Sequence, residues 1–255
     1  MLINYEEYKM MYEAEGSLWW YKILHEKVLS AITERYKEDN KIKILDAGCG
    51  TGGLMDYLIR NGYTNIQGFD FSIDAVSFCK QRDLDVKHLD ITKLDKVFNH
   101  DEFDVIVNND VVYQFEDNEI TKIFGDFSRI IKPTGIIITN NNAFNIFRGT
   151  HDIAVGGMQR FTIKSFRRIL NVLPLRIYSF TYWSLFLSPI ILLVRLIQQF
   201  QIKLNLINLN NIKSDVKVPS EIINNLFFQL VKFESYLFKK SFFGSSLFII
   251  IGKKN

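Results

Sequence analysis

Residues 44–53 read Ile-Leu-Asp-Ala-Gly-Cys-Gly-Thr-Gly-Gly, and this stretch decides the fold. A short apolar run that ends in an acidic residue and then in closely spaced glycines predicts a buried strand, a tight turn and the start of a helix. Bare glycine backbone lets a ligand approach both the turn and the positive end of the helix. The glycine spacing satisfies both a G-x-G-x-G and a dinucleotide G-x-G-x-x-G pattern, so the spacing alone leaves the ligand open.

Strands and helices alternate on the C-terminal side of this turn. We predict strands over residues 41–45, 65–69, 84–88, 103–107 and 135–139. We predict helices from the turn to about residue 60, after a capping Ser72, and over residues 117–131, where Pro133 prevents continuation. Strands that alternate with helices in this way imply an α/β fold with a doubly wound, mostly parallel sheet.

Acidic residues stand at three successive strand ends: Asp46, Asp70 and Asp90. The carboxyl ends of parallel strands meet along one crevice, where ligands of open α/β sheets bind. Asp46 would repel a pyrophosphate but suits a ligand that carries ammonium and sulfonium charge. Asp70 can accept hydrogen bonds from both ribose hydroxyls, and Asp90 can accept one from an adenine amino group. The pattern therefore favours a positively charged nucleoside.

The chain resembles the class I S-adenosylmethionine-dependent methyltransferases over residues 40–140. The matching pieces are residues 45–52, 68–72, the loop at Asp90, 103–107 and 131–135. The resemblance implies a Rossmann-like seven-stranded sheet with an antiparallel last strand, and S-adenosylmethionine as the cofactor. It implies these cofactor contacts: Asp46, Gly48, Cys49, Gly50, Gly52, Asp70, Phe71, Asp90, Ile91, Asn108 and Trp20. Thr134 stands where the family usually has glycine.

The flanks of this region resemble methyltransferases that act on small or lipidic molecules. An aromatic segment at residues 17–21 resembles one that such enzymes fold over the cofactor, and residues 149–162 resemble one that reaches the substrate. We expect His151 as a general base, with Asp152 next to it in sequence as a further catalytic candidate and Tyr113 as a substrate contact; alternatively, His151 only hydrogen-bonds its own loop. Gln114 replaces a frequent family histidine, so no base is expected there.

Outside the alternation the chain reads as helical at its start and apolar near its end. We expect two N-terminal helices with Ser17 as the N-cap of the second, a helix over 162–170, and strands over 175–182 and 245–251. The interpretation is a single methyltransferase domain, 1–255, with these parts: N-terminal helical cap, 1–40; cofactor-binding core, 41–182; helical lid insert, 183–242; last strand, 243–255.

The insert carries a very apolar segment, residues 183–200, which Arg195 interrupts, and an amphipathic helix from near Ser220. A membrane-spanning helix needs about 20 apolar residues, so we expect none here. Three interpretations remain: a buried lid helix, a monotopic surface anchor, or the wall of a pocket for an apolar substrate. We favour a lid with an apolar pocket over contact with an anionic membrane surface.

Composition limits the class of protein. The 255 residues carry a net charge of +3, which divides into −7 over residues 1–150 and +10 over residues 151–255. The apolar content of 47% excludes a mainly disordered chain. Cys49 and Cys79 are too few for a disulfide framework and are not spaced like zinc ligands, so we expect no metal. The first residues show no secretory signal, and we expect a cytoplasmic protein, with peripheral membrane contact as an option.

The predicted function is methyl transfer to an apolar or amphiphilic small molecule of lipid, prenyl, quinone or secondary-metabolite type. In-line displacement depends mainly on alignment in a dry site, so a base is optional for a good nucleophile. A protein or nucleic-acid methyltransferase that docks through its basic half is an alternative. No Asn/Asp-Pro-Pro-Tyr run follows the fourth strand, so a nucleic-acid partner is not expected. A catalytically silent cofactor-binding scaffold is the other alternative.

Overall fold

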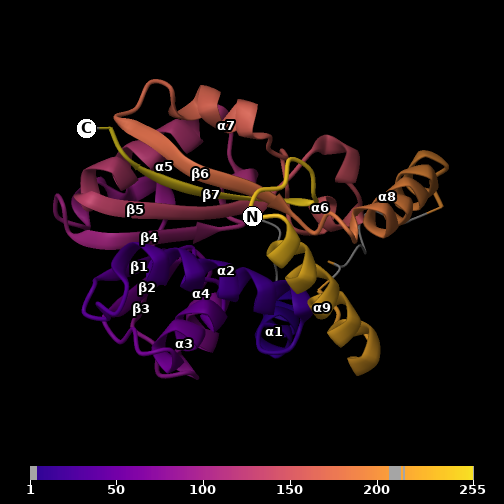
Figure 1. Ribbon diagram of the computed structural model, residues 1–255, viewed down its shortest axis with the longest axis horizontal. Coiled ribbons are helices and arrows are strands. Elements are labelled where there is room, and N and C mark those ends of the chain that lie inside the picture. The colour runs from indigo at the N-terminus through magenta and orange to yellow at the C-terminus, as the bar shows by residue number, and fades with distance from the viewer. Residues whose placement is uncertain (1–4, 207–213, 215, 255) are drawn as a thin grey trace.

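The computed structural model describes residues 5–206, 214 and 216–254, and its centre is one seven-stranded sheet with helices on both faces (Figure 1). The strand order is β3-β2-β1-β4-β5-β7-β6. The strands are β1 Ile44–Ala47, β2 Ile66–Asp70, β3 Val86–His88, β4 Phe103–Asn109, β5 Ile131–Asn142, β6 Leu175–Trp183 and β7 Ser246–Lys253. Strands β1 to β5 pair in parallel, and β7 is antiparallel to both β5 and β6. The predicted fold class is confirmed.

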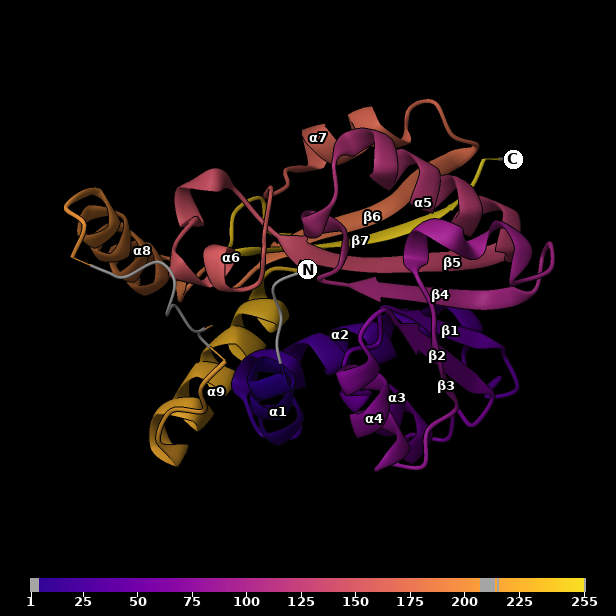
Figure 2. The ribbon, with the colours of Figure 1, turned by 180° about the vertical axis from the view of Figure 1, so that it is seen from behind.

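Nine α-helices surround the sheet within the described residues (Figure 2). They are α1 Tyr5–Ala14, α2 Trp19–Tyr36, α3 Gly53–Arg60, α4 Ile73–Lys80, α5 Asp117–Ile130, α6 Thr150–Ala154, α7 Ile163–Leu170, α8 Ser188–Lys203 and α9 Glu221–Leu237. Short 3-10 turns cover Ile91–Lys96, Val112–Gln114 and Asn145–Phe147. The short helix α6 is the one that the sequence patterns did not predict, because five residues are too few to show a period.

The sheet is buried on both faces, as the continuous apolar run in β5 predicts. Ile137 belongs to a core that α5 and α7 complete, and its neighbours Ile136 and Ile138 belong to a second core that α2, α3 and α9 complete. These isoleucines are at most 1% exposed. Alternation along the strand therefore sends successive side chains into opposite layers.

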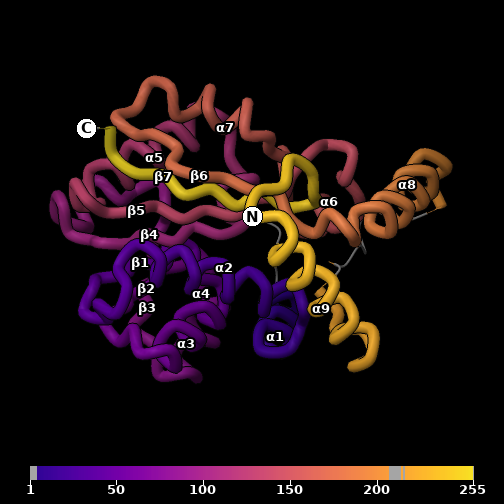
Figure 3. Tube along the Cα trace, in the orientation of Figure 1, coloured from indigo at the N-terminus to yellow at the C-terminus, as the bar shows by residue number. Residues whose placement is uncertain are grey.

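Contacts distant in sequence attach the insert to the N-terminal helices. In Figure 3, α9 lies beside α2, and Asn224 of α9 accepts a hydrogen bond from Trp19 N (2.9 Å) and donates one to Ser17 O (2.8 Å). The prediction that Ser17 caps α2 is wrong, since Leu18 is the N-cap residue and the Ser17 hydroxyl bonds Ala14 O. By contrast, Ser72 caps α4 as predicted, accepting from Ala75 N.

Helices α8 and α9 extend from one end of the molecule (Figures 1 and 2). Every helix within the described ranges falls short of the length and hydropathy needed to cross a membrane. The proposed division into cap, core, insert and last strand stays a prediction, because the elements form one continuous arrangement around the sheet.

Candidate active site

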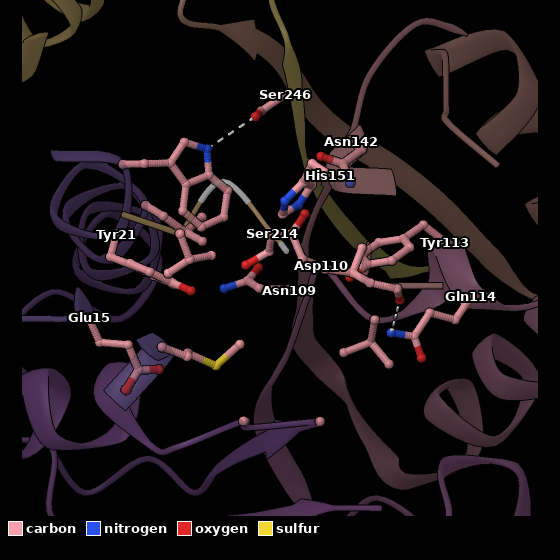
Figure 4. A pocket seen from close by; sticks show the side chains of 18 of the residues that line it. Glu15, Tyr21, Asn109, Asp110, Tyr113, Gln114, Asn142, His151, Ser214 and Ser246 are labelled. Carbon is pink, nitrogen blue, oxygen red and sulfur yellow. Dashed lines mark hydrogen bonds between the residues drawn. The ribbon is translucent and has the colours of Figure 1, made fainter. Parts of the chain in front are cut away.

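A cavity of about 830 Å³ opens above the carboxyl ends of β1, β2 and β4. Its floor is the glycine turn and the strand ends, and its walls come from α1, α2 and the insert. Figure 4 shows Glu15 and Tyr21 on one side of the cavity and Asp110, His151 and Tyr113 on the opposite side. The cavity lies where open α/β sheets bind ligands, and its volume is at the upper end of the range of about 300–1,000 Å³ for small-molecule sites.

The glycine turn brings bare backbone to the cavity floor. Gly48 has φ +83°, and a Cβ added there would lie 2.5 Å from a methyl group of Val111, so only glycine fits. The amides of Gly48 and Cys49 donate to Phe69 O at 2.9 and 3.0 Å, which fixes the turn to the end of β2. Gly52 does not line the cavity; its Cα faces Leu84 and Cys79 instead, which corrects its predicted contact role.

Asp70 is locked in place at the end of β2. One carboxylate oxygen accepts from Gly50 N and the other from Ser72 N, both at 2.9 Å. Burial raises its pKa, and these backbone donors oppose the rise. Phe71, the next residue, and Ile91, which follows Asp90, also line the cavity. The carboxylate therefore keeps one orientation, with lone pairs still available to a ligand.

Asp90 stands after β3 and begins the 3-10 turn Ile91–Lys96. Its Oδ1 accepts from both the amide and the hydroxyl of Thr92 at 2.9 and 2.8 Å. Partial burial raises the pKa of Asp90, but the Thr92 hydrogen bonds and the nearby Lys93 ammonium outweigh this and hold it below its ordinary value. Asp90 is therefore a charged acceptor at the rim.

A surplus of buried carboxyl groups faces the cavity. Burial, with the charges of Glu15 and Asp70, raises the pKa of Asp46 to about 8. Burial raises the pKa of Glu15 to about 7, although the Thr51 hydroxyl (2.6 Å) and Arg82 (3.1 Å) stabilise its charge. Buried charges need a partner. The cavity is therefore suited to a ligand with positive charge.

Asp110 adds a further acid on the opposite side. Burial raises its pKa to about 7, against the Asn140 amide that donates to Oδ2 at 2.8 Å. The residue follows β4 with φ +52°. Within the described parts of the chain, no group of three His, Cys, Asp or Glu residues is arranged to hold a metal ion.

The predicted contact at Asn108 is wrong by one residue. Asn108 is fully buried and its side-chain amide donates to Ala47 O at 2.7 Å, whereas Asn109 and Asp110 line the cavity. Successive residues of a strand point to opposite faces of the sheet, so a shift of one position exchanges a buried side chain for one that faces the cavity.

The predicted catalytic residues separate into two groups. His151 and Tyr113 line the cavity, and burial raises the pKa of the Tyr113 hydroxyl. Asp152 does not line it: its carboxylate accepts two hydrogen bonds from Arg160 at 2.7 and 3.0 Å and one from Gly149 N at 2.8 Å. Both partners of this ion pair are buried. The Asp152 carboxylate is thus engaged by Arg160 and Gly149 and anchors the start of α6, and its catalytic role stays a prediction.

Sequence reasoning missed the wall that α1 supplies. Tyr8 and Met11 of this helix, and Glu15 directly after it, line the cavity beside Trp20 of α2, whose ring stacks on that of Trp183 with 5.7 Å between the ring centroids. The helical period of residues 5–14 predicts a helix but not its packing partner. The available signal was Glu15, an acidic residue two positions before the aromatic segment.

Comparisons with known proteins agree with this geometry. Residues 38–152 match the family model described as "Methyltransferase domain". Phosphoethanolamine N-methyltransferase 1 of Zea mays is 27% identical over 52% of this chain and 28% of its own length. The ubiquinone biosynthesis O-methyltransferase of Rickettsia typhi is 28% identical over 53% of this chain and 60% of its own length. The chain thus spans less than two thirds of either relative.

Solved structures give the same fold over most of the chain. A SAM-dependent methyltransferase from Archaeoglobus fulgidus superposes with a TM-score of 0.56 at 15% identity, covering 91% of this chain and 94% of the other. An S-adenosylmethionine-dependent methyltransferase from Clostridium acetobutylicum gives 0.55 at 13% identity and covers 92% of both chains. At these identities the likeness establishes the architecture.

Proposed function

We propose that this protein, whose residues 38–152 match a methyltransferase-domain family model, is a class I S-adenosylmethionine-dependent enzyme that transfers a methyl group from S-adenosylmethionine to a small acceptor molecule. The observation that carries the proposal is the surplus of buried acids around the glycine turn. Burial raises the pKa values of both Asp46 and Glu15 there; Arg82 is a cationic partner of Glu15, whereas the groups that act on the pKa of Asp46 include no cation. A sulfonium nucleoside with an α-ammonium group brings the missing positive charge.

The described residues fit each part of S-adenosylmethionine. Asp70 is oriented to accept from ribose hydroxyls, and Asp90 is a charged acceptor in reach of the adenine side. Cys49 and Gly50 present backbone beside them. When bound, the cofactor supplies an electrophilic methyl group on a sulfonium sulfur.

The acceptor we infer is apolar or amphiphilic. Large apolar side chains contribute to the cavity wall: Phe147, Val155 and Trp19, with Ile191 and Phe227 from the insert. Large apolar walls with few polar groups favour ligands with substantial apolar surface. The named relatives act on phosphoethanolamine and on a ubiquinone precursor, and both acceptors are small molecules. A lid role for the insert accords with the residues that it adds to the cavity wall, among them Ile191, Arg195 and Phe227.

We assign His151 as the base and Tyr113 as an acceptor contact, since both line the cavity opposite the acids of α1 and β1. A hydroxyl acceptor must lose a proton as its oxygen attacks, and an imidazole in reach can take it. His151→Gln is expected to lower turnover about 10²- to 10⁴-fold while S-adenosylmethionine binding stays unchanged. Equal turnover by the variant and the wild-type protein would remove the base role.

Calorimetric titration with S-adenosylmethionine tests the cofactor assignment. Binding by the wild-type protein and its loss in Asp70→Asn are expected, with Asp56→Asn as the matched control, because Asp56 pairs with Arg60 on the surface of α3. Binding of NADH in place of S-adenosylmethionine would refute the proposal. Binding without methyl transfer to any acceptor in a broad panel would instead favour the scaffold interpretation.

A further inference from the structure

Helix α8 turns its polar side chains toward the protein and its large apolar side chains toward the outside. Its inner face carries Arg195 and Gln198, which hydrogen-bond each other at 2.8 Å, and Gln198 also accepts from Thr150 N at 3.2 Å. Its outer face carries large apolar side chains at helical spacing, each 44–62% exposed: Ile190, Leu193, Val194, Ile197 and Phe200. A surface helix of a globular protein normally buries its apolar stripe. This stripe therefore faces away from the protein's own core.

Helix α9 repeats the arrangement. Phe228, Val231 and Glu234 are its buried residues, and Glu234 accepts from Phe186 N at 2.9 Å. Its opposite face is apolar and exposed: Ile222, Leu226, Phe233, Tyr236 and Leu237. We call the ten exposed residues of the two helices the α8–α9 surface.

Charge around the α8–α9 surface indicates what covers it. Residues 184–206 contain no acidic residue, and α8 ends with the exposed Lys203. Exposed lysines also precede and follow α9, at Lys217, which lines the cavity, and at Lys239 and Lys240, while the exposed acid of α9 is Glu221 at its start. A second copy of the chain would bring the same positive charge to the contact, whereas an anionic lipid surface brings the opposite charge.

The length of α8 favours a position on the bilayer surface over insertion across the bilayer. At 1.5 Å per residue the 16 residues of α8 extend about 24 Å, shorter than a hydrocarbon core of about 30 Å. A helix with an apolar face and flanking cations lies in the interface plane, with its apolar side chains about 5–10 Å below the headgroups.

We propose that the α8–α9 surface docks the protein onto an anionic lipid bilayer. Ile191 and Arg195 on the inner face of α8, and Phe227 of α9, line the cavity, so the bilayer would lie about one helix diameter, roughly 10 Å, from it. The docking proposal is independent of methyl transfer. The further idea that the acceptor resides in the membrane rests on the proposed function.

Vesicle flotation tests the docking. The wild-type protein is expected to float with phosphatidylcholine vesicles that contain phosphatidylserine, and to float less without phosphatidylserine or at high salt. Leu193→Gln/Ile197→Gln/Phe200→Gln should weaken vesicle binding about 100-fold, because three apolar side chains that the bilayer would partly bury are lost. The matched control, Ile73→Gln/Val97→Gln/Val172→Gln, changes three exposed apolar residues elsewhere and should float like the wild type.

A second readout keeps the proposal falsifiable if a variant folds poorly. An environment-sensitive dye on Ile197→Cys should shift to the blue with anionic vesicles, and the same dye on Val172→Cys should not; both native cysteines are buried. No flotation and no shift would overturn the proposal. So would a concentration-dependent dimer that the α8 triple variant abolishes. Calorimetry with S-adenosylmethionine on the α8 triple variant, expected unchanged, separates a docking failure from a failure of the proposed function.

Discussion

Asp46 gives the most informative perturbation of the proposed cofactor site. Its carboxyl is buried at the end of β1 between Glu15 and Asp70, and its pKa is raised to about 8. In the free protein at pH 7, roughly nine in ten molecules therefore carry it protonated. A cation in the cavity favours the charged form, so binding must release a proton.

The structure fixes the sign and size of the pH dependence. Below pH 8, affinity for S-adenosylmethionine should rise about tenfold per pH unit, because each unit raises the charged fraction of Asp46 about tenfold. Above about pH 8 it should fall, since an α-amino group with a pKa of about 7.7–8.0 loses its own charge. Asp46→Asn should bind weakly and keep only the falling branch.

The folding stability of the wild-type protein should fall as pH rises toward 8, whereas its affinity for S-adenosylmethionine rises. A carboxyl whose pKa rises from 3.8 to about 8 on folding contributes stability below pH 4 that is lost as pH rises through 8. An asparagine has no charge to bury, so at pH 8–9 Asp46→Asn should be more stable than the wild type by up to about 6 kcal/mol, at about 1.4 kcal/mol per pKa unit. The variant thus gains stability where it loses binding.

The assays are calorimetry across pH 6–9, in buffers of different ionisation enthalpy to count protons, and thermal unfolding at pH 5 and pH 9. Asp56→Asn is the control, because it removes a carboxyl from a surface pair on α3. A wild-type affinity that does not change between pH 6 and pH 8, or an Asp46→Asn protein less stable than the wild type at pH 9, would refute the reasoning.

Three further variants test separate parts of the structure. Gly48→Ala should abolish cofactor binding and cost about 1–3 kcal/mol, seen by denaturant unfolding, because φ is +83° and Val111 fills the space; unchanged binding would contradict the turn geometry. Asp152→Asn should cost about 3–5 kcal/mol by leaving Arg160 as a buried unpaired charge, and a loss below 1 kcal/mol would restore a catalytic interpretation of Asp152. Asn224→Ala should cost about 1 kcal/mol by uncapping α2, whereas Asn225→Ala, one position along, should cost little.

The sequence predicts the central sheet well because its signals are local. The glycine turn, the apolar strands and the acids that follow them lie within a few residues of each other, and parallel strands bring Asp46, Asp70 and Asp90 to one edge without further information. The capping serine of α4 is equally local.

The remaining parts of the site depend on packing over long distances. Whether Asn108 or Asn109 faces the cavity depends on strand register, which the apolar pattern of β4 does not mark near its end. Glu15 reaches the cavity because α1 packs beside α4, and Asp152 turns away because Arg160, eight residues later, binds it.

The insert shows a different limit. Helical periodicity locates apolar stripes on α8 and α9, but it does not show whether the protein's own core or a lipid bilayer covers them. In α8 the polar Arg195 and Gln198 turn inward because Thr150 and the cavity lie there, and this leaves the apolar stripe outside.

A crystal structure of the protein grown with S-adenosylhomocysteine tests the central claim most directly. The account predicts both ribose hydroxyls within hydrogen-bonding distance of the Asp70 carboxylate and the amino-acid portion beside Asp46. Density for the nucleoside elsewhere, or none at saturating ligand, would contradict it.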